Sequence, residues 1–70
     1  MMPLILTDPG DEVIVQKLGG SAEVRQHLAD LGFSAGTPVT VVSTTAGNVI
    51  VKVRETRVAI SREMAQKIMV

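Results

Sequence analysis

The sequence has 70 residues, enough for one small domain, and a chain of this size buries only about 60% of its unfolded surface. It contains no cysteine, which excludes disulfides and thiolate metal sites. It has seven residues of each charge sign and so lacks the basic excess typical of nucleic-acid-binding proteins. No stretch approaches the ~20 apolar residues of a membrane span, and the start of the chain lacks the basic region of a signal peptide, so we predict a cytoplasmic single domain over residues 1–70.

The first part of the chain predicts a strand that follows a turn. Leu4–Thr7 is a short apolar lead-in, and Asp8–Asp11 has the Pro-Gly composition of a turn. Glu12–Leu18 is rich in β-branched residues and is predicted as one strand, with Val13 and Val15 pointing inward.

A helix and a sharp corner follow, and the rest of the chain is organised around them. Ser21 suits a helix N-cap, and an apolar stripe then recurs at helical spacing. Glycine after that stripe predicts a left-handed C′ residue, and the aromatic residue after it predicts a Schellman ending. A second glycine leads into a strand that begins at Pro38, where a missing N–H does least harm. The fold-defining residues of this corner are Leu28, Leu31, Gly32, Phe33 and Gly36.

The second half of the chain predicts a three-strand meander, a short helix and a last strand. Val49, Val51 and Val53 alternate with Ile50, Lys52 and Arg54, which is the pattern of a half-buried strand. The Glu55-Thr56 connection is a poor pair for a two-residue hairpin, which prefers Asn-Gly or Asp-Gly. Ser61 suits the cap of the short helix. The predicted segments are Val39–Thr44, a turn at Gly47-Asn48, Val49–Arg54, Arg57–Ile60, a helix over Arg62–Gln66 and a strand over Lys67–Val70.

This order predicts a mainly β fold, an SH3-like barrel of about five strands. One helix lies between the first two strands and a short helix precedes the last. Closure of a small barrel removes exposed strand edges, and the last strand is expected to pair with the first.

The chain shows no pattern of a catalytic or cofactor site. His27 is the single histidine, whereas a nitrogen and oxygen metal site usually needs two histidines or converging carboxylates. We interpret it as a surface residue bonded to Asp30 or to water; a metal site shared across a symmetric dimer is the alternative. Ser21 and Ser61 are caps rather than nucleophiles, because no base accompanies them. We therefore predict no enzyme activity, no cofactor and no metal site.

A candidate partner-binding surface comes from the same alternation. If Val39, Val41, Val49, Val51 and Val53 point inward, then the outward residues form a mixed apolar and basic patch suited to a partner with an acidic rim. Burial under a helix or under Met1–Leu6 is the alternative. The patch residues are Val42, Ile50, Lys52 and Arg54.

Three segments resemble the signatures of the FeoA family. The stretch Leu28–Val39 resembles the family's central "RL-x-D/E-L/M-G-h-x-x-G-x-x-V" signature. Pro9–Val13 resembles its opening "PG-x-x-V", and Arg57–Ala65 its late "x-h-A/S-L-R-x-x-x-A" element. The sequence departs from the pattern at a shortened connection, Thr45–Asn48, and at the glycine usual in the next hairpin, where Glu55 stands nearby.

The resemblance implies an SH3-like barrel that acts as a small cytoplasmic accessory of FeoB, a ferrous iron transporter of the membrane. It implies no catalytic residue. The alternative role is a module like the C-terminal domain of diphtheria toxin repressor-like regulators, since one fold serves several functions. A small hydrolase or nucleotide binder is disfavoured by the missing phosphate loop and acid–base pair. The oligomeric state, including a weak homo-oligomer, stays open.

Overall fold

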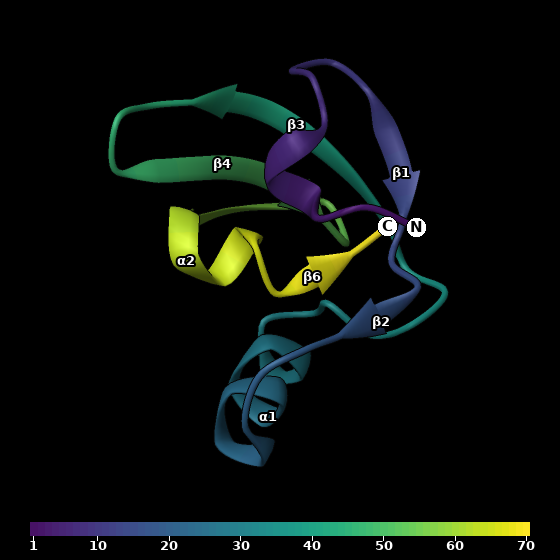
Figure 1. Cartoon of the computed structure of the whole chain (residues 1–70). Helices are drawn as coiled ribbons and strands as arrows, with labels where there is room; N and C mark the ends of the chain where they lie inside the picture. Colours follow the sequence, from purple (N-terminus) through teal and green to yellow (C-terminus); the bar gives the residue numbers. More distant parts are fainter.

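The computed structural model describes residues 1–70, and its strands form two antiparallel sheets with the helices on one side (Figure 1). The four-stranded sheet has the order β1-β3-β4-β5, and β2 pairs with β6. The mainly β class and the predicted order of strands and helices are confirmed. In chain order the elements are η1 (Leu4–Leu6), β1 (Glu12–Ile14), β2 (Lys17–Leu18), α1 (Ala22–Asp30), β3 (Pro38–Thr44), β4 (Asn48–Val53), β5 (Thr56–Ser61), α2 (Arg62–Ala65) and β6 (Ile68–Met69).

The predicted first strand is divided into β1 and β2. The N–H of Val15 still donates to Thr37 in the segment before β3, at 2.9 Å, whereas the N–H of Gln16 donates to Met69 of β6, at 2.7 Å. The chain therefore changes hydrogen-bonding partner between these two residues and passes from one sheet to the other. Val15 is 1% exposed and Val13 is half-buried against the core, so both point inward as predicted.

The corner after α1 has the predicted conformation. The Ser21 hydroxyl accepts from the N–H of Val24, at 3.2 Å, and caps the helix. At the other end, Gly32 has φ +107°, the N–H of Phe33 donates to the Leu28 carbonyl at 3.0 Å, and the N–H of Gly32 donates to Ala29 at 3.0 Å. These are the two bonds of a Schellman ending. Gly36 also has a positive φ, +89°, before β3 begins at Pro38.

The meander differs from the prediction at both of its turns and at one strand position. Asn48 is the first residue of β4 and not, as predicted, part of the turn before it. The hairpin between β4 and β5 turns at Arg54-Glu55, because Val53 pairs with Thr56; the predicted Glu55-Thr56 connection and the placement of Arg54 in the strand are wrong. Both turn residues have positive φ, 51° and 65°. In β3 the register shifts between Val41 and Ser43, so Val42 is an extra residue in a bulge and Ser43 pairs with Ile50.

The end of the chain closes the fold between two earlier segments. β6 pairs with β2 on one side, and on the other Val70 exchanges two backbone hydrogen bonds with Met2, of 2.8 and 2.9 Å. Figure 1 shows the two termini side by side. The predicted pairing of the last strand with the first is therefore present in its second part, β2, although β6 is shorter than the predicted Lys67–Val70.

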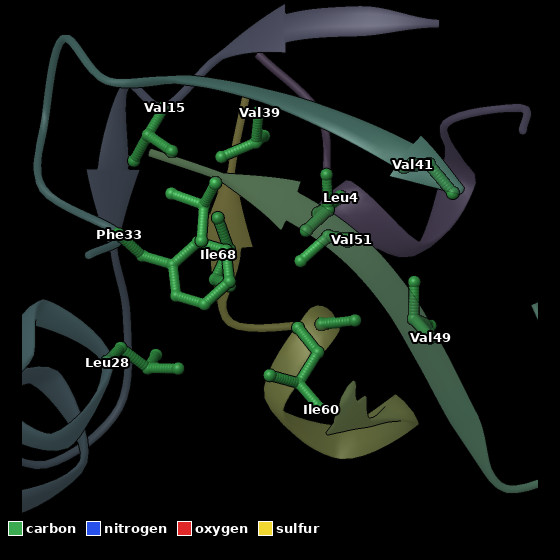
Figure 2. Close-up of a cluster of buried hydrophobic side chains, with 12 residues drawn as sticks. Leu4, Val15, Leu28, Phe33, Val39, Val41, Val49, Val51, Ile60 and Ile68 are labelled. Atoms are coloured by element: carbon green, nitrogen blue, oxygen red, sulfur yellow. The ribbon is translucent and has the colours of Figure 1, made fainter. Parts of the chain in front are cut away.

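The core lies between the inner face of the four-stranded sheet and the segments below it. Figure 2 shows Val39 and Val51 near Phe33 and Ile68, with Leu4 of η1 beside Val51, while Val41 and Val49 lie farther along β3 and β4. The lead-in is thus part of the core, since Leu4 is 0% exposed. Neither helix has the length and apolar content needed to cross a membrane. The buried apolar residues are Leu4, Val15, Leu28, Phe33, Val39, Val41, Val49, Val51, Val53, Ile60, Ala65 and Ile68.

Candidate partner-binding site

The outer face of the four-stranded sheet is the surface on which the predicted patch lies. Val49, Val51 and Val53 of β4 are all buried, so the residues between them, Ile50 and Lys52, point to the opposite face. Ile50 is half-buried and Lys52 is exposed. No helix covers this face in Figure 1, where α1, α2 and β6 lie on the other side of β3 and β4.

Cross-strand pairing places the outward residues in rows. One row crosses all four strands and carries charge on three of them: Glu12 pairs with Thr40, Thr40 with Lys52, and Lys52 with Arg57. Residues paired across strands have Cβ atoms about 4.5–5.5 Å apart, so Lys52 and Arg57 form a local concentration of positive charge.

A second row, next to the charged one, has no charged residue and two apolar ones. Ser43 pairs with Ile50, and Ile50 with Ala59, whose side chain is exposed. The charged row is also bordered on its other side by apolar residues, since Ile14 of β1 pairs with Pro38 and is 43% exposed. The outer face therefore alternates apolar, charged and apolar rows.

The Arg54-Glu55 turn forms one end of this face. A shallow depression there is lined by Glu12, Pro38, Thr40, Lys52, Arg54 and Glu55. The Cδ of Arg54 lies 3.4 Å from where a Cβ on Gly32 would be, so its stem packs over the C-terminal end of α1. A cation is favoured there, because the last carbonyls of a helix carry partial negative charge.

The structure brings together three of the four predicted patch residues and places the fourth in the β3 bulge. Ile50, Lys52 and Arg54 share the outer face or its end, whereas Val42 is half-buried in the bulge and has no partner in β4. Sequence reasoning missed Glu12 and Glu55, which make the depression mixed in charge rather than basic. Glu12 could have been found from the alternation of β1 once its pairing with β3 was assumed.

His27 is exposed on α1, away from this face. Of the two partners expected for it, Asp30 or water, Asp30 makes no hydrogen bond with His27; Asp30 accepts from the side-chain amide of Gln26, at 2.9 Å. Nowhere in residues 1–70 do three or more His, Cys, Asp or Glu side chains gather closely enough to hold a metal ion.

The FeoA domain model matches residues 2–70. The chain belongs to the FeoA family. It is 36% identical over 70 residues to "Putative Fe(2+) transport protein A" of Methanocaldococcus jannaschii, covering 100% of this chain and 85% of that protein. It also matches the crystal structure of an iron uptake regulatory protein, FeoA, with 32% identity and a TM-score of 0.89, over 97% of this chain and 90% of the other.

More distant structures extend the likeness of fold. The zinc complex of Stenotrophomonas maltophilia FeoA, described as a prokaryotic SH3 domain protein, has 24% identity and a TM-score of 0.80, over 99% of this chain and 88% of that one. This confirms the predicted SH3-like class. A manganese-dependent transcriptional repressor has 22% identity and a TM-score of 0.86; the match covers 94% of this chain but 38% of the repressor.

Proposed function

We propose that this FeoA-family chain is a non-enzymatic accessory module of a ferrous iron transporter. It acts in the cytoplasm by docking on the cytoplasmic part of an FeoB-type membrane protein through the outer face of the four-stranded sheet. The observation that carries the proposal is that the family likeness extends over the whole sheet, while the outer face carries exposed Ile14, Ala59 and Lys52 without any covering helix. Exposed apolar residues beside charges are typical of protein interfaces.

The rows of the outer face define the chemistry of the partner surface. Apolar side chains of the transporter would cover Ile50 and Ala59, and an acidic side chain would lie against Lys52 and Arg57. Glu12 and Glu55 at the depression would repel a partner whose acidic residue is displaced toward them. Such a mixed pattern attracts the partner and also determines the position in which it binds on the outer face.

A double substitution, Ile50→Asp with Arg54→Glu, tests this docking. We expect pull-down of the transporter's cytoplasmic portion to weaken by at least about tenfold, since two contacts at a desolvated interface are lost. The matched control introduces the same two acidic residues on the exposed side of α1, Ala22→Asp with Arg25→Glu, and should bind normally.

Ile50 is half-buried, so a second variant separates loss of binding from loss of fold. Lys52→Glu changes an exposed side chain in the same patch, and surface changes usually alter stability by less than about 0.5 kcal/mol. If Lys52→Glu and the double variant both remain folded and bind as the parent does, the docking surface lies elsewhere.

The likeness to the manganese-dependent repressor supports a second candidate, a module that binds the DNA-binding part of such a regulator. The match covers 38% of the repressor, so residues 1–70 correspond to only one part of it. Binding of this chain to an isolated repressor DNA-binding domain, in a titration with Mn²⁺ present, would support this candidate over the transporter.

A further inference from the structure

Strand β5 forms one edge of the four-stranded sheet. It has six residues and pairs with β4 only, through every position from Thr56 to Ser61. It contains no proline and no bulge, and its exposed positions include Arg57 and Ala59. An unbroken edge of this kind can pair with another extended chain.

The turn decides which backbone groups of β5 are free. A two-residue hairpin closes with a hydrogen-bonded pair, here Val53 with Thr56, and hydrogen-bonded pairs then alternate along the ladder. Val58 and Ile60 thus bond to β4, whereas Arg57 and Ala59 direct their N–H and C=O groups away from it. No turn, loop or cap hydrogen bond of the chain uses these four groups, so they are free to bind another strand.

The opposite edge of the sheet is less suited to such pairing. β1 has three residues, and the chain leaves the sheet directly after it, when Gln16 bonds to Met69. Before β1 lies the Asp8–Asp11 turn. An added strand would find about half the pairing length there that β5 provides.

We propose that β5 binds an extended segment of a protein partner as an additional strand, with an acidic side chain of that segment opposite Arg57. The outer-face rows set the side-chain pattern. The charged row ends at Arg57 and the apolar row at Ala59, so the segment carries an acidic residue and, two positions away, an apolar one. This recognition uses backbone groups of β5 that the transporter docking proposed above does not need, although both proposals use the Arg57 and Ala59 side chains; the test below contains no transporter, so the two can fail independently.

Charge disfavours a second copy of this chain as the occupant in the two registers centred on Val58 and on Arg57. Antiparallel pairing of two β5 strands about Val58 would place the two Arg57 side chains diagonally across the new ladder, and pairing about Arg57 would place them directly opposite. Lys52 stands beside Arg57 in both copies and adds to the repulsion. An acidic segment instead neutralises the row.

A synthetic peptide tests the proposal without any transporter. The probe is a short capped peptide of alternating threonine and valine with one central glutamate, titrated into the isotope-labelled chain and followed by NMR. We expect shifts and slowed hydrogen exchange at the Arg57 and Ala59 amides, with the Val58 amide already protected. Replacing the glutamate by lysine should weaken binding about threefold, and Arg57→Glu should reverse this preference.

Proline supplies the decisive variant. Ala59→Pro removes an N–H that faces away from β4, so the ladder stays intact while an added strand loses a donor and meets the ring. Ala59→Val, which keeps the N–H, is the matched control and should still bind. A peptide with the same side chains but N-methylated amides on its pairing edge should fail with the parent chain, which keeps the test valid even if the proline variant unfolds.

The proposal is overturned if the Arg57 and Ala59 amides are unaffected up to the solubility limit of the peptide. Equal binding by Ala59→Pro or by the N-methylated peptide would overturn it as well. Self-association of the peptide-free chain through β5 would show that a second copy is the occupant and would also overturn it.

Discussion

The corner after α1 and the turn between β4 and β5 both redirect the chain through residues of positive φ, but for opposite reasons. In the corner these residues are Gly32 and Gly36, which lack the Cβ that makes such backbone conformations unfavourable. In the turn they are Arg54 and Glu55, which have no intrinsic preference for it. The two sites lie close together, since side-chain atoms of Val53 and Arg54 lie 3.4 Å from where a Cβ on Gly32 would be.

The difference shows where local residues determine structure and where distant pairing does. The corner follows from a helical stripe, a glycine and an aromatic residue that are adjacent in sequence. The turn is held by six paired positions of β4 and β5, and those strands are fixed by their buried valines and by Ile60. The pairing therefore overcomes a local cost of about 1–3 kcal/mol per residue. Glu55 also stands near the position at which the family usually has a hairpin glycine, and a glycine there would adopt the positive φ more easily.

The largest test concerns the region that depends most on distant partners. Deleting Lys67 to Val70 removes the carbonyls that accept from Gln16 and Gly19, the pairing with Met2, and the fully buried Ile68. Losing one buried isoleucine already costs about 2–5 kcal/mol, comparable to the stability of a domain this small. We expect the truncated chain to lose cooperative thermal unfolding, measured by circular dichroism. A truncated chain that unfolds cooperatively as a monomer would show that β6 does not close the fold.

The same distinction explains what the sequence could predict. The inward valines, the serine caps and both glycine conformations follow from neighbouring residues, and all were predicted correctly. The division of Glu12–Leu18 into two strands was not, because it depends on Thr37 and Met69, which are remote in sequence. The bulge at Val42 and the turn at Arg54-Glu55 depend likewise on strand register, which alternation alone does not specify.

The candidate site divides in the same way. Alternation placed Ile50 and Lys52 on the outer face, and the structure places them there. The acidic residues of the depression, Glu12 and Glu55, belong to β1 and to the turn, so they join the site only through sheet pairing. The free backbone groups of β5 could not be identified from the sequence either, because the position of the turn decides which of them face away from β4.

Gly32 provides the next test. Gly32→Val should destabilise the protein by at least about 2 kcal/mol, because a β-branched residue is strained at positive φ and because its Cβ would stand 3.4 Å from Val53 and Arg54. Denaturant unfolding measures the change. The control is Gly47→Val, at a glycine with no positive φ and open space around it, which should alter stability by less than about 0.5 kcal/mol. Equal effects at both glycines would refute the assigned role of Gly32.

The smallest expected effect is an increase in stability. Replacing the turn by Asn-Gly, through Arg54→Asn with Glu55→Gly, supplies the residues that a two-residue hairpin of this φ pattern prefers, and should stabilise the protein by about 1 kcal/mol in denaturant unfolding. The same variant loses the Arg54 side chain at the end of the outer face, so it should bind the transporter's cytoplasmic portion more weakly while being more stable. Glu55→Gly alone keeps Arg54 and should gain part of the stability without losing binding. If Asn-Gly instead lowers the unfolding midpoint, the Arg54-Glu55 backbone is not strained, and the contrast between the turn and the glycine corner does not hold.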